Sequence, residues 1–463
     1  MSNAQHQCPH EKLQLEPSPH AAEAGFVQQP LARRLAAATK TGRITAAVKA
    51  QAAAAVDELA PSFPAPLVLP DDDLALDPKY PPQSFRSWLN LKERNKPTKA
   101  RRTLYVAATP EITSEVAFMD GWLQPGLCTS ESSPNTVLSG LRPPAGEDMI
   151  SYLAVFYHGM SVKPLPQRLR YVSWKDPRSR SKSRSKPHAK GPKTDTQYVA
   201  LATDNRATRI RARPSPDGQF RGQLNLNDIL DAAIESLPED AYSLVLLIDH
   251  DMYEDEDDDF CCGRAYGGSR VAVVSGSRYH PALDGQAGIE YNHMWPASHC
   301  KSFVNESCGM TASLSKQYSD DLAATSTCSP MREAIDAAKS IIIPTTEKGL
   351  CALWFSRLAR TVAHELGHCL GMGHCVYYAC SMQGTASIAE DIRQPPYLCP
   401  VCLEKLSYAV ACEIGRRRFD DRLSYVEERY RAIAAFCEKW SDNGLFAGYL
   451  AWLRARLRLL GSE

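Results

Sequence analysis

Apolar runs of strand length recur in the middle of the chain and predict a β-sheet. Residues 103–108 and 242–248 are two such runs, and the second is apolar on both faces, as an inner strand between two helical layers should be. Residues 270–275 form a third run, which follows a pair of glycines. Residues 224–237 carry apolar side chains at helical spacing, which predicts an amphipathic helix before the second strand. Together these elements indicate an α/β fold with a compact mixed β-sheet.

A long helix is predicted to end near residue 369. Thr345 or Thr346 can cap its first turn, because a threonine hydroxyl accepts hydrogen bonds from the first free backbone N–H groups. His364 and His368 lie on one side of this helix, facing away from the sheet. The opposite, apolar side consists of Phe355, Leu358, Val362, Leu366 and Cys369.

Composition divides the chain into three regions. Residues 1–100 are rich in alanine and proline, and we expect a low-order arm, because the proline-rich stretch would detach any helix within it from the domain. Residues 101–415 form the main domain, and residues 416–463 form a helical C-terminal tail. Segments with helical periodicity near that end span residues 403–414, 423–440 and 445–460.

Two inserts interrupt the main domain, at residues 175–196 and 280–340. Within the first insert, residues 175–193 hold eight Lys or Arg residues against the single acid Asp176, so this stretch cannot form a core. It is a loop without a dedicated partner, a nuclear-import or nucleic-acid patch, or a loop controlled by phosphorylation. The lack of interleaved aromatic residues argues against specific binding of RNA.

Net charge is zero, with 53 basic and 53 acidic residues, which removes a general argument for nucleic-acid or membrane partners. The first residues show no basic start followed by an apolar run, and no apolar stretch is long enough to span a bilayer. The fifteen cysteines are an odd count, which suits a reducing compartment better than a disulfide framework. We expect an intracellular protein, cytoplasmic or nuclear, that is neither secreted nor membrane-bound; its oligomeric state stays open.

Residues 364–374 have the spacing of a catalytic metal site. His364 and His368 lie one helical turn apart and can bind one ion together. Gly371 can adopt the left-handed conformation that ends a helix, so that the chain turns back and brings His374 in as a third ligand. Three protein ligands leave a fourth position of zinc open for water, and Glu365 is placed to act as general base.

A second set of ligands starts directly after the third histidine. Cys375 and Cys380 are followed by Cys399 and Cys402, which form a C-x-x-C pair. Four thiolates make a closed tetrahedral site, which holds zinc for structure because no position remains for water. The alternatives are free thiols or disulfides.

The order of these residues resembles the archaemetzincin family of zinc metallopeptidases, whose motif joins an extended H-E-x-x-H site to four cysteines. The resemblance implies a metzincin-like fold with an active-site helix, and a zinc metallopeptidase that acts on peptides or proteins. It implies two zinc ions, one catalytic and one structural, with Glu365 as general base and Met382 below the catalytic ion. Tyr377 or Tyr378 could stabilise the oxyanion. The gap between Met382 and Cys399 is one residue shorter than in the family pattern.

A protein whose zinc sites stabilise a binding or regulatory surface, with weak or no catalysis, is the alternative function. The presence of Glu365 argues against it, because a site that has lost catalysis has no reason to keep a base.

Two further groups contain metal-ligating residue types without a recognisable spacing. The first is His6, Cys8, His10 and His20, which we expect to be solvated tail residues. The second lies in the insert at 280–340, which we expect to be a surface excursion, and consists of His280, His293, His299, Cys300, Cys308 and Cys328.

Overall fold

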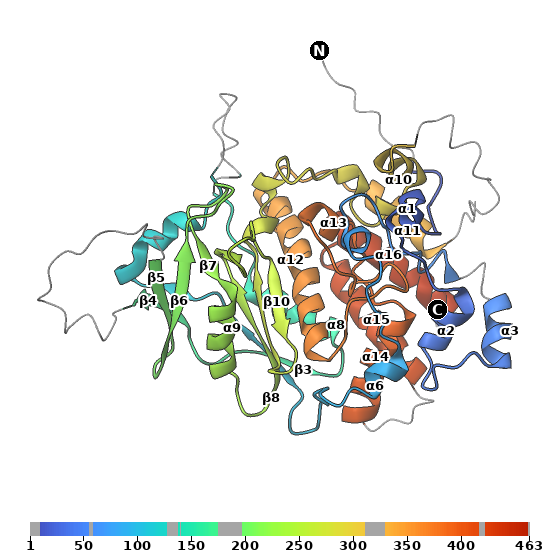
Figure 1. The fold of residues 1–463 in the computed structure, drawn as a ribbon, viewed down its shortest axis with the longest axis horizontal. Helices are drawn as coiled ribbons and strands as arrows, with labels where there is room; N and C mark the ends of the chain where they lie inside the picture. The colour runs from blue at the N-terminus through green and yellow to red at the C-terminus, as the bar shows by residue number, and fades with distance from the viewer. Residues whose placement is uncertain are drawn as a thin grey trace, which may run out of the picture.

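The computed structural model describes residues 10–54, 59–126, 138, 140–174, 197–310, 329–415 and 422–461. The strands occupy one half of the molecule and most of the helices the other, with helix α12 (Glu347–Cys369) between them (Figure 1). Among the described residues, no helix combines the length and the apolar character needed to cross a membrane. The basic stretch 175–193 lies outside the described residues.

The central sheet has five strands in the order β10-β11-β8-β1-β3. Strands β11, β8, β1 and β3 are parallel, and β10 runs antiparallel to β11 at the edge. Three of the strands coincide with the predicted runs at 103–108, 242–248 and 270–275, so the α/β class with a mixed sheet is confirmed. The strands are β1 Thr103–Ala107, β3 Ser161–Pro164, β8 Ala241–Ile248, β10 Gly263–Tyr266 and β11 Val271–Ser275.

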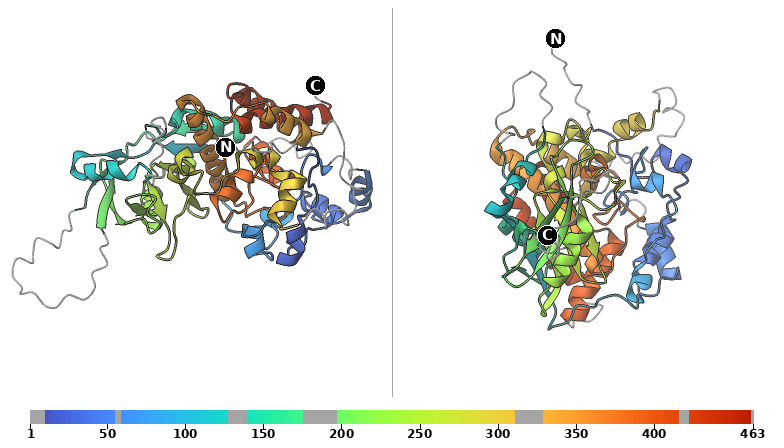
Figure 2. Two further views of the ribbon diagram at one scale, coloured as in Figure 1. Left: turned by 90° about the horizontal axis from the view of Figure 1, so that it is seen from above. Right: turned by 60° about the vertical axis from the view of Figure 1, so that its left-hand side comes forward.

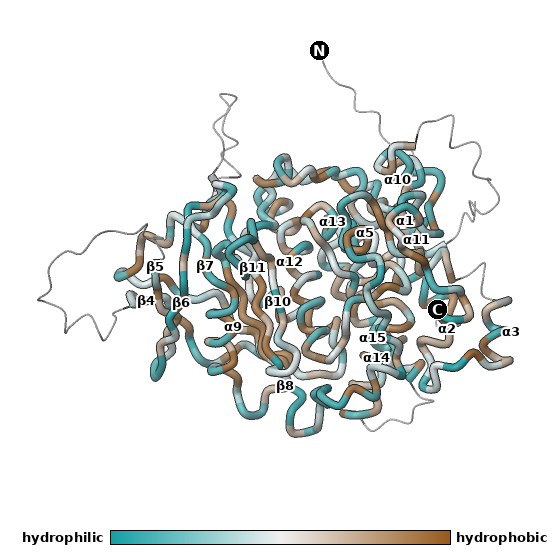
Figure 3. Tube along the Cα trace, in the orientation of Figure 1, coloured by the Kyte–Doolittle hydropathy of each residue, from teal (hydrophilic) through white to brown (hydrophobic). Residues whose placement is uncertain are grey.

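Each face of this sheet packs against its own hydrophobic core. On β8, Val245 and Leu247 face the core shared with α12, whereas Leu244 and Leu246 face the core shared with helix α9 (Leu226–Glu235). A strand with a core on both sides is mostly apolar, which explains the hydrophobic colour along most of β8 in Figure 3. The sheet therefore holds α12 rigidly along one face.

A second sheet of six strands, in the order β2-β4-β5-β6-β7-β9, lies beyond α9. The sequence predicts one sheet, and the predicted runs at 103–108, 242–248 and 270–275 all lie in the first sheet. The strands of the second sheet are short or alternate polar with buried positions, as β6 does, so most of them carry no apolar run. Their bounds are β2 Glu111–Ile112, β4 Arg170–Ser173, β5 Gln197–Ala202, β6 Ala207–Arg213, β7 Gln223–Asn225 and β9 Asp251–Tyr253.

The helical half of the molecule packs on the other side of α12. The predicted C-terminal helices are confirmed, and they share the core of α12, where the rings of Phe355 and Trp440 stack 4.7 Å apart. The bounds are α8 Gly146–Phe156, α10 Lys301–Ser307, α11 Pro330–Lys339, α13 Ile388–Arg393, α14 Pro400–Ser407 with a π-helical continuation Tyr408–Ile414, α15 Arg422–Glu438 and α16 Gly444–Leu459.

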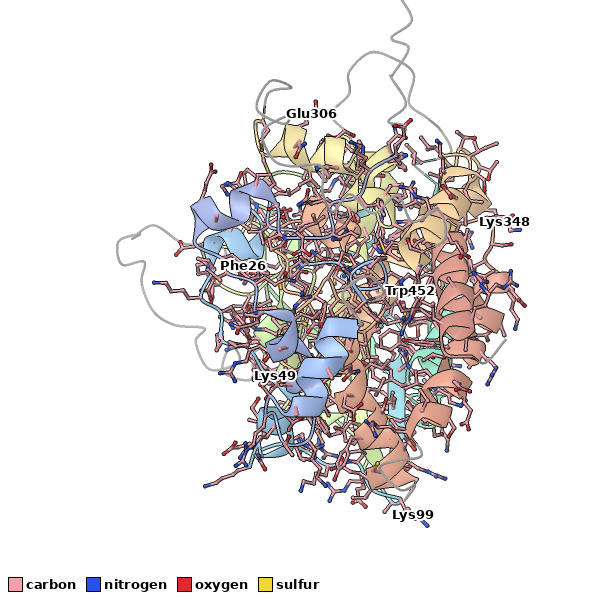
Figure 4. The ribbon with its side chains drawn as sticks, turned by 90° about the vertical axis from the view of Figure 1, so that its right-hand side faces the viewer. Phe26, Lys49, Lys99, Glu306, Lys348 and Trp452 are labelled. Carbon is pink, nitrogen blue, oxygen red and sulfur yellow. The ribbon has the colours of Figure 1, made fainter. Side chains whose placement is uncertain are left out.

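The N-terminal region differs from the expected low-order arm over its described residues. Its short helices lie on the side of the molecule away from the six-stranded sheet (Figure 2), and Figure 4 shows them against the C-terminal helices. The proline-rich stretch packs against the C-terminal helices. Phe63 is buried, and the centroid of its ring lies 5.4 Å from that of Trp452. The indole N–H of Trp452 donates to the carbonyl of Ser62 at 3.0 Å. Extended, proline-containing backbone can bury alternate side chains as well as link domains. The helices are α1 Pro19–Ala24, α2 Leu31–Ala37, α3 Ala46–Ala54, α5 Asp73–Leu76 and α6 Phe85–Leu89.

The insert at 280–340 is not a surface excursion in its described parts, 280–310 and 329–340. Trp295 and Met331 are buried in the main core, and Arg357 of α12 forms an ion pair with Asp284 at 2.7 Å. The expectation was wrong because the segment has few apolar runs, yet single large side chains anchor it at intervals. The division into three domains stays a prediction.

Candidate active site

Helix α12 brings two of the predicted ligands together. Thr346 caps the helix by accepting from the backbone N–H of Gly349 at 3.2 Å, so of the two predicted caps the second is the one used. His364 and His368 rise from one side of the helix with their Nε2 atoms 3.0 Å apart. Nδ1 of His364 donates to the carbonyl of Ser381, and Nδ1 of His368 to that of Met372, both at 2.7 Å. These bonds leave both Nε2 lone pairs facing the same point.

The turn after the helix supplies the third histidine. Gly371 has a φ of 77°, the left-handed conformation predicted for it, and its N–H donates to the carbonyl of His368 at 2.9 Å. The chain reverses and places His374 beside the other two rings, with centroids 5.4 Å from His364 and 5.1 Å from His368. One ligand atom from each of the three side chains lies within 4.8 Å of the others.

Burial favours the neutral form of the three imidazoles, which is the form that binds a metal. Burial lowers the pKa of His364, lowers that of His368 to about 4, and lowers that of His374. Three neutral nitrogen donors around one point fit a zinc ion with one open position.

Met382 lies directly beneath this group. A Cβ atom at Gly367, between the two helical histidines, would overlap the sulfur of Met382, so the methionine fills the space under the helix. The carbonyl of Met382 also accepts from the N–H of Cys375 at 2.7 Å. The predicted position of Met382 below the histidines therefore agrees with the geometry.

Glu365 faces the strand at the edge of the sheet. Gly263 of β10 is so close that an added Cβ would lie 3.4 Å from Cγ of Glu365. Burial raises the pKa of Glu365 to about 8, and the nearby Arg264 acts in the opposite direction. The predicted strand at 270–275 is β11, which pairs with β10 on one side and with β8 on the other and so is not at the edge. The edge strand is β10, a four-residue strand with no apolar run to reveal it.

A cleft of about 520 Å³ opens over these residues. It is lined by the three histidines, Glu365, the residues of β10 from Gly263 to Ala265, and the segment from Thr385 to Ile388. Neither Tyr377 nor Tyr378 lines it; both are buried, and the ring of Tyr378 lies against the guanidinium of Arg34. The tyrosines on the cleft are Tyr80 and Tyr279.

The N-terminal region supports the site in a way that local spacing could not indicate. The indole of Trp88 donates to the carbonyl of Leu370 at 2.9 Å, and Gln83 bonds the carbonyl of Gly371 and the N–H of Gly373, each at 2.9 Å. The turn between the second and third histidine is thus held from outside.

Asp73 borders the third histidine. Its carboxylate and Nδ1 of His374 both approach Gly384, where an added Cβ would lie 2.7 Å from that nitrogen. The negative charge of Asp73 raises the pKa of His374, against the larger effect of burial. Tyr80 lies on the other side, with its ring centroid 5.4 Å from that of His374.

The four predicted cysteines form a second, closed group. One sulfur from each of Cys375, Cys380, Cys399 and Cys402 lies within 4.8 Å of the others, and all four residues are buried. The sulfurs of Cys375 and Cys399 are 3.5 Å apart, which is too far for a disulfide bond. The four cysteines are therefore free thiols that cluster together. The sulfur of Cys380 accepts from the N–H of Cys399 at 3.3 Å. Four thiolates without a solvent-facing position fit a structural zinc ion.

Comparisons with known proteins agree with this arrangement. Residues 344–408 match the sequence profile of peptidase family M54. Archaemetzincin-2 of Homo sapiens is 28% identical over 221 residues, which is 48% of this chain and 47% of that protein. Archaemetzincin-1 of Homo sapiens is 28% identical over 213 residues, 45% of this chain and 35% of that protein.

The chain thus spans about half the length, or less, of these curated relatives. A solved structure of archaemetzincin from Methanopyrus kandleri is 14% identical and aligns over 68% of this chain and 98% of that chain, with a TM-score of 0.31. The profile match spans α12, the turn, all three histidines and all four cysteines. About half of the chain is therefore similar to archaemetzincins, and residues 344–408, which carry all seven predicted metal ligands, match peptidase family M54.

Proposed function

We propose that this protein is a zinc-dependent metallopeptidase in which His364, His368 and His374 hold the catalytic zinc and Glu365 is the general base. The observation that carries the proposal is the meeting of three neutral imidazoles and one buried carboxylate under an edge strand with an unpaired side. We further propose that the four cysteines hold a second, structural zinc. A zinc ion at the histidines would supply a Lewis acid and lower the pKa of a bound water to about 7.

Glu365 suits the transfer of a proton in both directions. Burial raises the pKa of its carboxyl to about 8, and a dication held by the flanking histidines would lower that value toward neutrality. A carboxyl group whose pKa lies near the working pH can accept a proton from water and return it to the leaving amine. Its position on α12 between the two helical histidines fixes the carboxylate against the cleft.

Strand β10 provides the site for the substrate. Among the strands that the structure describes, it pairs with β11 alone, so its other edge offers backbone N–H and C=O groups to an extended peptide. Gly263, Arg264 and Ala265 line the same cleft as Glu365, which places such a peptide over the catalytic group. Recognition through backbone atoms explains how a peptide bond could be positioned without a deep side-chain pocket.

The test compares unmodified protein with Glu365→Gln on a broad peptide library, with cleavage followed by mass spectrometry and a chelator control. Glutamine has nearly the same shape as glutamate but cannot take a proton, so we expect a loss of about a hundred- to ten-thousand-fold in rate with unchanged zinc content. The matched control is Glu347→Gln, which makes the same change in the exposed first turn of the same helix and should cleave normally.

Equal cleavage by the unmodified and Glu365→Gln proteins would contradict the mechanism. If neither protein cleaves any peptide, the alternative of a zinc-stabilised binding protein is favoured.

A further inference from the structure

A third cluster of metal-ligating side chains lies apart from the two sites above. His10, His293 and Cys300 each place one ligand atom within 4.8 Å of the others. His10 belongs to the N-terminal group that was expected to be solvated, and the other two belong to the insert at 280–340. One ligand of the cluster comes from the N-terminal group and two come from the insert. For this reason no motif spacing in the sequence reveals the cluster.

Both histidines are oriented as metal-binding histidines usually are. Nε2 of His10 donates to the carbonyl of Asn292 at 2.9 Å, and Nδ1 of His293 donates to the carboxylate of Glu290 at 2.9 Å. An oxygen acceptor on one ring nitrogen fixes the proton there, so the other nitrogen carries the lone pair that can bind an ion. The same arrangement holds His364, whose Nδ1 donates to a backbone carbonyl.

The ligand atom of His10 has no other role in the fold. Nδ1 of His10 is buried and has no hydrogen-bond partner among the described residues, and the residue as a whole is only 7% exposed. A buried polar atom without a partner costs about 1–3 kcal/mol, so a native structure usually supplies one. Cys300, which is 1% exposed, offers a sulfur within reach of that nitrogen.

The backbone around the cluster is fixed on all sides. Leu13 pairs with Cys300 in a β-bridge, and the N–H of Lys301 donates to the carbonyl of Lys12 at 2.9 Å. Arg332 of α11 donates to the carbonyls of His10 and Glu11, each at 2.6 Å. The ring of His293 stacks on Phe303 with centroids 4.2 Å apart. The backbone that carries the three ligands is therefore held in place without an ion.

An ion could also reach the cluster from solvent. His10 lines a cavity of about 430 Å³ between α11 and the start of α16, and His293 lines a second one of about 220 Å³ beside Phe303. Each histidine of the cluster thus borders a cavity, so an ion can approach the cluster past either of them.

We propose that His10, His293 and Cys300 form a third metal site, which binds Zn²⁺ or a similar borderline-soft divalent ion. Two imidazoles and one thiolate select this class over Mg²⁺ and Ca²⁺, which require oxygen ligands. Binding releases the thiol proton of Cys300 and joins the N-terminal segment to the insert, some 280 residues away in sequence. The role of the ion at this site is to hold these two segments together.

The experiment counts zinc in full-length protein that has been equilibrated with a zinc buffer at nanomolar free metal, which removes loosely held ions. The unmodified protein should carry one more zinc per chain than Cys300→Ser and one more than His10→Ala. Cys308→Ser is the matched control, because Cys308 lies in the same insert but outside the cluster, and it should keep the full count. After replacement of zinc by cobalt, Cys300→Ser should also lower the thiolate-to-cobalt absorption, by about one thiolate in five.

Equal zinc content in the unmodified protein and Cys300→Ser would overturn the proposal, and so would an equal loss of zinc in Cys308→Ser. Near-ultraviolet circular dichroism separates these results from unfolding, because a folded variant keeps the signal of its buried tryptophans. The test compares the zinc content of variants, so its outcome does not depend on the two zinc sites of the proposed function. The zinc content of His374→Ala and of Cys399→Ser tests those two sites separately.

Discussion

Replacing Gly371 with alanine tests the turn that carries the chain from the second histidine to the third. The glycine has a φ of 77°, where an L-residue with a side chain costs roughly 1–2 kcal/mol. An added Cβ would also lie 3.0 Å from Cγ of Arg94. Arg94 cannot easily move, because its guanidinium binds Glu413 at 2.5 and 2.9 Å and lies 4.0 Å from the ring of Trp88. Overpacking of this kind adds about 1–3 kcal/mol.

We therefore expect Gly371→Ala to lower the free energy of unfolding by roughly 2–5 kcal/mol. Gly373→Ala is the matched control in the same turn, because its Cβ would meet the Gln83 side chain at 3.7 Å, an ordinary contact, and its φ is not positive. That variant should stay within about 0.5 kcal/mol of the unmodified protein. Urea unfolding followed by tryptophan fluorescence measures both, and equal midpoints for the two variants would refute the reasoning.

Three further predictions concern other parts of the molecule. Cys399→Ser should lose one zinc and much of the fold, while Cys437→Ser, a change at a buried cysteine outside the cluster, should keep its zinc; metal analysis with circular dichroism compares them. Asp73→Asn should weaken zinc binding at the histidines by roughly tenfold, as judged by competition with a chelator, because the charge beside the third histidine is lost. Burial lowers the pKa of His250 to about 4, below its value of about 6.5 in an unfolded chain, so the unfolded state takes up this proton first and stability falls as pH drops from 6.5 toward 4. In the unmodified protein, this effect lowers the free energy of unfolding by roughly 2 kcal/mol between pH 7 and pH 5, and His250→Gln should remove that decrease. If urea titrations give both proteins the same dependence of unfolding free energy on pH, the prediction is contradicted.

The ligand groups could be predicted from sequence because their geometry is local. Residues four apart on a helix share a side, a glycine ends the helix, and a short turn fixes where His374 and Cys375 lie. The buried strand 242–248 was predictable for a related reason: a strand with a core on each face has no polar positions to obscure it.

The supports of the site could not be predicted in this way, since they come from contacts between distant parts of the chain. Trp88 and Gln83 reach the turn after α12 from 282 and 288 residues away. Nothing in the spacing of an alanine- and proline-rich segment indicates such a contact. The edge strand β10 was missed because four residues with mixed polarity carry no periodic signal.

The packing of Ser62 and Phe63 against Trp452 has a consequence for the time course of synthesis. The hydrogen bond between Ser62 and Trp452 joins residues 390 positions apart. A ribosome needs roughly 20–80 s to add that many residues, and during this time Phe63 and its neighbours lack the surface that buries them in the finished fold. The zinc ligands between residues 364 and 402 emerge before that surface is complete. The region around Phe63 should therefore stay exposed during synthesis until helix α16 has been made.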